Sequence, residues 1–200
     1  MAQLIGGGAH LIIDGSINWG PDGPRKSANG FDFDARRNSI YEWVRQVRGG
    51  ILAGAFTVER HLSAAIVFFM LGDRVKIPEV QFAFDEGLLG PLSFERRINV
   101  AILLAPKFLT TSEVASLKGD LNELRSLRNA MAHRPFWFHP QLSKEDEVVE
   151  LVPVITRGKS QLPLTTKLIG ESNAMIASLI VRCHRLSRAA AEANGAPPTA

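Results

Sequence analysis

The stretch "TTSEVASLKGDLNELRSLRNAMAHRP", residues 110–135, has the clearest helical pattern in the chain. Thr110 followed three residues later by Glu113 has the spacing of a capping box, in which two side chains satisfy each other's backbone N–H groups at a helix start. Apolar residues then recur at steps of three and four, which places them on one face of a helix. They are Val114, Leu117, Leu121, Leu124, Leu127 and Met131. Because Pro135 cannot continue the helix, we expect one amphipathic helix between Thr110 and Pro135.

A long apolar helix is expected nearer the N-terminus, beginning at about Asp34. Its apolar positions keep helical spacing on both sides of Gly49 and Gly50, a pair that we interpret as a kink or break. These positions are Ile40, Trp43, Val44, Val47, Ile51, Ala55, Val58, Leu62 and Ile66. The charged triplet Glu59–His61 would be costly in a bilayer, so the pattern favours a core helix of a soluble domain over a membrane span.

Three further helices are predicted from caps and helix breakers. Ser93 can cap a helix that Pro106 ends. Pro78 suits the first turn of a short helix at 79–86. A last amphipathic helix begins near Thr165, because apolar residues again recur with helical spacing after it.

Two short apolar runs before the last helix predict a β-hairpin. "FWF", residues 136–138, and "EVVELVPVI", residues 147–155, are rich in aromatic and β-branched residues and are separated by the polar loop 139–146. A further short strand is expected at "HLIID", residues 10–14. The expected fold class is therefore mainly α, a bundle of four or five helices with a small β-hairpin inserted before the C-terminal helix.

Length and composition favour one domain and an intracellular setting. The 200 residues are 46% hydrophobic, enough for one core, and we expect a loose arm at 1–33, one helical domain at 34–192 and a disordered tail at 193–200. Cys183 is the only cysteine, which excludes an internal disulfide and fits a reducing cytoplasm. No metal or cofactor site is predicted, and a net charge of +3 permits nucleic-acid contact without requiring it.

Polar residues gather at the carboxyl end of the 110–135 helix. Arg128 lies four residues after Leu124, at the border of the apolar stripe, while Asn129 and His133 are four residues apart and share one face. A simple structural explanation exists, since a cation in the last helical turn meets the negative end of the helix dipole. The Arg-to-His spacing also arises by chance in a chain with this many arginines. The spacing alone therefore does not distinguish a functional site from a simple helix end.

That context comes from a family resemblance. Residues 90–135, "GPLSFERRINVAILLAPKFLTTSEVASLKGDLNELRSLRNAMAHRP", resemble the HEPN superfamily of helical domains, and in particular its mannitol-repressor-like branch. The resemblance implies a commonly dimeric bundle and, in active members, metal-independent RNA cleavage. Carried over by position, Arg128 matches the motif arginine, Asn129 the polar residue after it, and His133 the motif histidine. Pro135 stands where the toxin branch often has tyrosine, and the mannitol-repressor-like branch is associated with regulation.

Two functions are therefore expected. A third hypothesis is a helical bundle in which the motif has arisen by chance. In the first, His133 takes a proton from a ribose 2′-hydroxyl while Arg128 stabilises the charge that develops on the phosphate and Asn129 orients it. In the second, the same fold is a non-catalytic regulator or interaction module. The expected partners are RNA or a nucleotide, a second copy of the chain in a homodimer, and a protein partner, with no membrane. His61 is expected to be structural, and Arg182, Arg185 and Arg188 are expected to form a solvated basic face.

Overall fold

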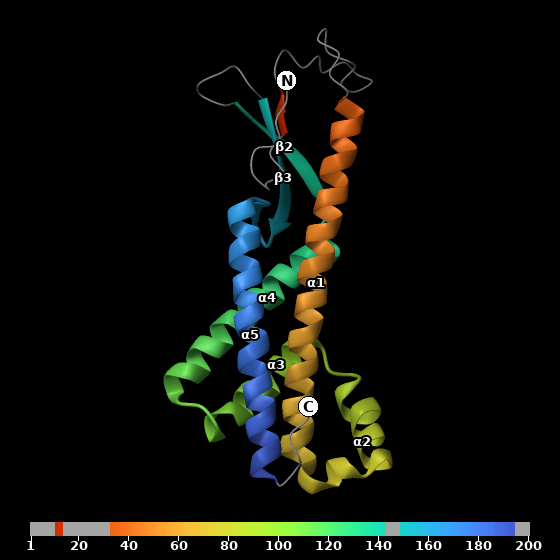
Figure 1. Ribbon diagram of the computed structural model, residues 1–200, viewed down its shortest axis with the longest axis vertical. Coiled ribbons are helices and arrows are strands. Elements are labelled where there is room, and N and C mark those ends of the chain that lie inside the picture. The colour runs from red at the N-terminus through yellow and green to blue at the C-terminus, as the bar shows by residue number, and fades with distance from the viewer. Residues whose placement is uncertain (1–10, 14–32, 143–148, 195–200) are drawn as a thin grey trace. The chain divides into compact units, whose positions relative to one another are not determined.

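The computed structural model describes residues 11–13, 33–142 and 149–194, and it is mainly helical with one small sheet (Figure 1). The α-helices are α1 (Phe33–Leu71), α2 (Pro78–Phe84), α3 (Phe94–Leu104), α4 (Thr111–His133) and α5 (Thr166–Ala193). Single turns of other helix types join them: η1 (Gly72–Lys76), η2 (Asp85–Leu89, a π-helix) and η3 (Ala105–Lys107). The predicted fold class, a mainly α bundle with a hairpin before the last helix, is confirmed.

The predicted helix starts are confirmed by their hydrogen bonds. The N–H of Thr110 donates to Oε2 of Glu113 at 2.8 Å, and the N–H of Glu113 donates to Oγ1 of Thr110 at 3.4 Å, which completes the capping box of α4. At α3, the N–H of Arg96 donates to Oγ of Ser93 at 3.3 Å. These caps satisfy amide groups that have no partner inside the helix.

Gly49 and Gly50 do not interrupt α1, so the predicted break is not present. The helix runs without a gap from Phe33 to Leu71. Neither glycine has a neighbour within 4 Å of where a Cβ would lie, and both are exposed. Glycine lowers helix propensity by about 0.5–1 kcal/mol relative to alanine but keeps every backbone hydrogen bond, and neighbouring buried residues can compensate for that cost.

The sheet is antiparallel and has one strand more than its sequence pattern predicted. Its strands are β1 (Leu11–Ile13), β2 (Phe136–Leu142), β3 (Val149–Arg157) and β4 (Ser160–Pro163). β3 pairs with all three others, and the predicted hairpin is β2–β3, with Phe136 opposite Ile155. Residues 139–142, predicted as loop, continue β2 because β3 offers them a hydrogen-bonding edge. The strand β4 was not predicted; Gly158, at φ 61°, supplies the two-residue turn that leads into it.

The chain divides into two compact units, and the boundaries pass through α1, α4 and α5. Unit 1 comprises residues 1–50 and 129–171, and unit 2 comprises residues 51–128 and 172–200. The sheet belongs to unit 1, whose buried apolar residues are Ile40, Val44, Ala130, Met131, Val152, Val154, Ile155 and Leu164. The predicted arm, 1–33, lies outside the described residues apart from Leu11–Ile13 and Phe33, which begins α1, and the predicted tail, 193–200, lies outside them apart from Ala193, which ends α5, and Asn194.

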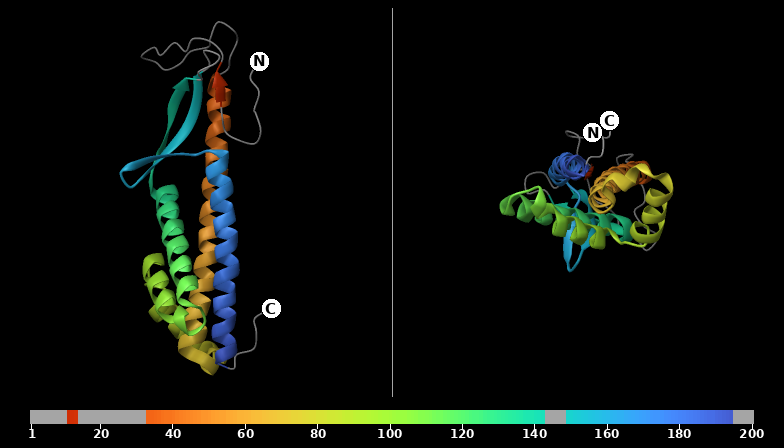
Figure 2. Two further views of the ribbon diagram at one scale, coloured as in Figure 1. Left: turned by 90° about the vertical axis from the view of Figure 1, so that its left-hand side faces the viewer. Right: turned by 90° about the horizontal axis from the view of Figure 1, so that it is seen from below.

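Unit 2 contains most of the helical core. Its largest fully buried side chains are Ile51, Leu62, Ile66, Ile98, Leu117, Leu121, Leu124 and Leu127. In this unit α1 and α5 lie side by side (Figure 2), and a Cβ on Gly54 would lie only 2.6 Å from Cγ2 of Ile176. The two helices approach closely at this point because glycine has no side chain.

The apolar length of α1 also meets a simple criterion for a membrane span. By length and composition alone, Ile40–Lys76 could cross a bilayer, a test that core helices of soluble proteins also pass. Within unit 2, α1 contributes Val58, Leu62 and Ile66 to the buried core. These three residues are buried by protein, while 39% of the apolar window of the segment is buried as a whole.

Candidate functional site at the end of α4

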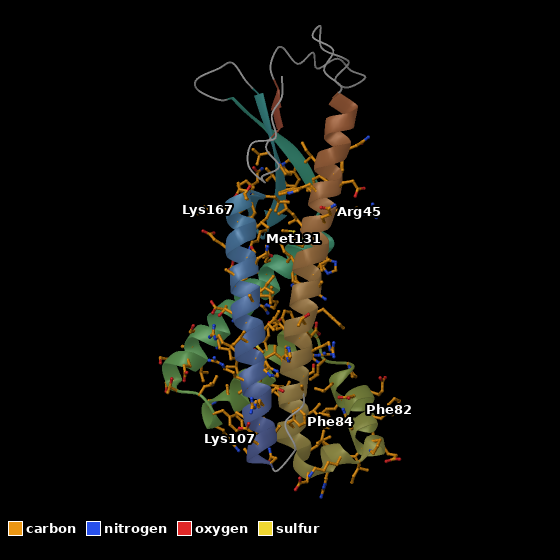
Figure 3. The ribbon with its side chains drawn as sticks, viewed as in Figure 1. Arg45, Phe82, Phe84, Lys107, Met131 and Lys167 are labelled. Atoms are coloured by element: carbon orange, nitrogen blue, oxygen red, sulfur yellow. The ribbon has the colours of Figure 1, made fainter. Side chains whose placement is uncertain are left out.

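The three predicted site residues all lie on the uninterrupted helix α4. Arg128 is half-buried, whereas Asn129 and His133 are exposed to solvent. Met131, labelled in Figure 3, is 1% exposed and marks this end of the helix, two residues before His133. The boundary between the two compact units falls between Arg128 and Asn129, so Arg128 belongs to unit 2 and the other two to unit 1.

His133 is the last residue of α4, and its accessibility follows from the way the helix ends. The N–H of Arg134 still donates to the carbonyl oxygen of Ala130 at 3.0 Å, while Pro135 has no N–H to extend the pattern. The buried stripe continues to Ala130 and Met131, so His133 lies off that stripe. An imidazole in this place is available to a ligand and also lies at the negative end of the helix dipole.

Arg48 is a second arginine at this end of α4 that was not predicted from the sequence. Its Nη2 donates a hydrogen bond to the carbonyl oxygen of Arg134. Its guanidinium carbon lies 5.8 Å from the centre of the Phe136 ring, within cation–π range. Tyr41 meets the same ring edge-on, with 5.1 Å between the ring centres. No local motif signals this contact, because the two arginines are 86 residues apart in the chain.

Two contacts hold the guanidinium of Arg48, but one of its N–H groups has no hydrogen-bond partner among the described residues. Its Nε is buried and has no hydrogen-bond partner among the described residues. A buried donor without a partner costs about 1–3 kcal/mol, which the hydrogen bond to Arg134 and the contact with Phe136 offset. The arrangement fixes a permanent positive charge beside the residue that follows His133.

Arg125 is already engaged elsewhere. The sequence places it on the same helical face as Asn129 and His133, but in the structure it forms an ion pair with Glu95 of α3. An arginine paired with a carboxylate has less freedom to bind a phosphate. It therefore contributes to the packing of α3 on α4.

A pair of histidines lies in unit 2. The rings of His61 and His184 meet edge-on, with 5.3 Å between their centres. The pKa of His61 is lowered first by burial and then by the charges of His184 and Arg60. His61 is thus half-buried against α5, where its neutral form is favoured.

The predicted basic face of α5 is largely neutralised by neighbouring groups. Arg182 forms an ion pair with Asp120 and donates to Oγ of Ser116 at 3.3 Å. Arg188 pairs with Glu192 at 2.9 Å. Of the three arginines, Arg185 alone is exposed without an ion pair to any described residue, which does not make a continuous surface for a nucleic-acid backbone.

Metal and thiol chemistry find little support in the described part of the chain. Its histidine, cysteine, aspartate and glutamate side chains form no group of three or more that could hold a metal ion. Burial raises the pKa of the Cys183 thiol to about 12. The thiol is therefore protonated at neutral pH and behaves as a small apolar side chain.

Comparison of the chain with models of protein families, with curated proteins and with solved structures found no match.

Proposed function

We propose that the chain is a HEPN-like domain that cleaves RNA without a metal ion, with Arg128, Asn129 and His133 as its catalytic residues. The observation that carries the proposal is the exposed imidazole of His133 at the end of α4, on the same uninterrupted helix as Arg128 and Asn129. The sequence resemblance assigns the same three positions to the motif of the superfamily. Arg48, anchored at Arg134, adds a fixed positive charge that suits a phosphate ligand.

The proposed reaction is an internal transesterification that releases the downstream RNA fragment with a 5′-hydroxyl end. His133 accepts the proton of a ribose 2′-hydroxyl, and the oxygen attacks the adjacent phosphorus. The bond from phosphorus to the 5′-oxygen breaks, the leaving oxygen takes up a proton from water, His133 returns its proton to the solvent, and a 2′,3′-cyclic phosphate remains on the upstream fragment. Arg128 stabilises the negative charge on the phosphate oxygens during this step, and Asn129 orients the phosphate.

The magnitudes indicate that one residue alone would not suffice. A positioned acid or base typically contributes about 10²–10⁴-fold to a rate. Removing one preorganised donor that stabilises an oxyanion costs about 10²–10³-fold. We therefore expect the proposed site to need both His133 and Arg128, supplied within one chain or by two copies in a homodimer.

Cleavage of mixed RNA in excess EDTA tests the proposal. The wild type should yield fragments ending in 2′,3′-cyclic phosphate, and His133→Ala and Arg128→Ala should each lower the rate at least about 100-fold. Arg185→Ala is the matched control. It removes an exposed arginine of α5, outside the proposed site, that forms no ion pair with a described residue. Equal cleavage by all four proteins, or none by the wild type, contradicts the proposal.

Exposed apolar side chains favour a second candidate, a non-catalytic interaction module with the same fold. Ile77, Phe82 and Leu88 are 46%, 69% and 50% exposed (Phe82 is labelled in Figure 3), and such residues are typical of protein interfaces when they gather in one segment. Association of the chain with itself should then depend on this segment. Sedimentation of the wild type and of Phe82→Ser tests it, because an unchanged dimer, or a monomer in both cases, counts against an interface here.

In either case we propose a cytoplasmic homodimer acting in bacterial regulation or defence, with RNA or a nucleotide as ligand. The supporting observations are the single buried thiol and the resemblance of residues 90–135. The RNA assay separates the two candidates, since only the first requires His133.

A further inference from the structure

Unit 2 contains a cavity of about 520 Å³, and none of its lining residues belongs to α4. It is open to solvent on one side and is lined by residues of α1, η1, α2, η2 and α3 and by Gly90, all of which belong to unit 2. The volume falls within the range of sites that bind small organic molecules. A cavity of this size formed by elements of a single unit is a candidate binding site.

An ion pair between α1 and α3 lines this cavity. Nη1 of Arg97 lies 3.3 Å from Oε1 of Glu59, and the two side chains are only 18% and 19% exposed. Arg97 also donates to Oγ of Ser63 at 2.9 Å and to the carbonyl oxygens of Leu89 and Leu92 at 3.0 and 3.2 Å. Four acceptors thus engage an arginine that has five N–H groups. Arg97 is largely satisfied by the protein and holds the irregular turn between η2 and α3 in place.

The polar groups of the cavity that have no partner among the described residues are mainly hydrogen-bond acceptors. Among the described residues, Oε2 of Glu59 receives no hydrogen bond, and the carboxylate of Asp85 has neither a hydrogen bond nor an ion pair. Asp85 lies half-buried on η2 and lines the cavity together with residues of α1, and Gln81, which also lines it, lies one turn earlier on α2. A half-buried carboxylate without a partner favours the approach of a cation. The one unpaired cation of the lining, Arg60, is exposed to solvent.

The rest of the lining is apolar. Val67, Phe68 and Leu89 are 5%, 9% and 3% exposed and form a wall. Phe56 also lines the cavity but is 62% exposed, which is unusual for a large aromatic side chain unless something covers it. An aromatic ring beside carboxylates is suited to an organic cation, since its face attracts positive charge.

We propose that this cavity binds a small organic cation, a protonated amine carried on an apolar body. The ammonium group donates to the Asp85 carboxylate and to Oε2 of Glu59, and the apolar body packs on Val67, Phe68 and Leu89. Arg97 does not contact the ligand; it positions Glu59. The site is independent of the proposed RNA cleavage, because it shares no residue with the end of α4.

Isothermal titration calorimetry with four compounds that share a phenyl group and a short chain tests the proposal. Phenethylamine should bind roughly tenfold or more tightly than phenethyl alcohol, because a charge-assisted hydrogen bond replaces a neutral one. Hydrocinnamate, an anion, should not bind. Phenylalanine, a zwitterion, should bind more weakly than phenethylamine, because its carboxylate is repelled by Asp85 and Glu59. Equal binding of the amine and the alcohol, or no binding of the amine at millimolar concentration, overturns the proposal.

Two variants locate the site. Asp85→Asn should weaken phenethylamine binding roughly fivefold or more and leave the alcohol unchanged, whereas Glu86→Gln removes the adjacent exposed carboxylate, which does not line the cavity, and should have no effect. Ala64→Phe places a ring in the cavity and should abolish binding. If Asp85→Asn and Glu86→Gln bind the amine equally well, the proposal is wrong. Because the comparison of the four compounds uses the wild type, its result stands even if a variant fails to fold.

Discussion

Arg48 of α1 donates a hydrogen bond to the backbone carbonyl of Arg134, the residue that immediately follows His133 and the last turn of α4. The contact connects two segments of unit 1 and satisfies one of the carbonyl groups that every helix leaves unpaired at its carboxyl end. The end of α4 is therefore held by a side chain of another helix as well as by its own sequence.

The first prediction concerns this contact. Arg48→Ala should lower the free energy of unfolding by about 1 kcal/mol, because the charged hydrogen bond and the cation–π contact that it removes are worth more than the unpartnered Nε costs. Urea denaturation measures the change. Arg45→Ala is the control: its side chain is 80% exposed and, among the described residues, pairs with Glu42 alone, so a change below about 0.5 kcal/mol is expected. Equal effects of the two substitutions would mean that the Arg134 contact does not stabilise the fold.

The second prediction concerns the close approach of α1 and α5. Gly54→Ala should destabilise the protein by about 1–3 kcal/mol, because the new Cβ would meet Ile176 and force the helices apart. Gly50→Ala should instead stabilise it by about 0.5–1 kcal/mol, since alanine favours the helix and nothing lies within 4 Å. Thermal unfolding of both variants checks the opposite signs. A stabilising Gly54→Ala would show that the helices are not in contact there.

The third prediction is a pH dependence from His61. Its pKa is lowered in the folded protein, so below the ordinary value of 6.5 the unfolded chain binds the proton more readily than the folded one. The free energy of unfolding should fall as the pH drops from about 6.5 toward the pKa of His61 in the folded protein. Above pH 6.5, His61 should add nothing to the pH dependence of the free energy of unfolding. His61→Gln should flatten the decrease between pH 7 and pH 5 in urea titrations, and His184→Gln should flatten it in part. A wild-type slope that survives His61→Gln would assign it to other groups.

The fourth prediction concerns the ion pair in the cavity. Arg97→Met should destabilise the protein by about 3–5 kcal/mol, because it leaves the Glu59 carboxylate and the Leu92 carbonyl without their partner, while the Leu89 carbonyl keeps the N–H of Leu92. Adding Glu59→Gln should recover part of the loss, since the second change removes the unpaired charge. Chemical denaturation of the two single variants and the double variant gives the coupling energy. Strict additivity would show that the two side chains do not interact.

Local patterns in the sequence predicted most of the secondary structure. The capping box at Thr110, the cap at Ser93 and the proline at 78 all signalled helix starts that the structure has. Their signal is local, because a capping residue and its partner lie within four positions of each other. The hairpin was predicted for the same reason, from its run of aromatic and β-branched residues.

The errors occurred where distant segments decide the structure. Glycine at 49 and 50 predicts a break by propensity alone, but propensity is a weak preference that packing can override. Residues 139–142 have a polar, loop-like sequence and became strand because β3 pairs with them. Strand pairing depends on which segment lies alongside, and a single stretch of sequence does not contain that information.

The candidate sites also combine features set by local sequence with features set by contacts between distant segments. Arg128, Asn129 and His133 are placed on one helix near its end by the local sequence, because the helical repeat and Pro135 set those positions. Tertiary packing accounts for the remaining features: His133 is exposed, Arg125 is engaged by Glu95, Arg48 contacts Arg134, and Glu59 and Arg97 meet in a cavity. Helical spacing fixes neighbours within about one turn, whereas contacts between residues tens of positions apart arise from the packing of whole helices against a shared core.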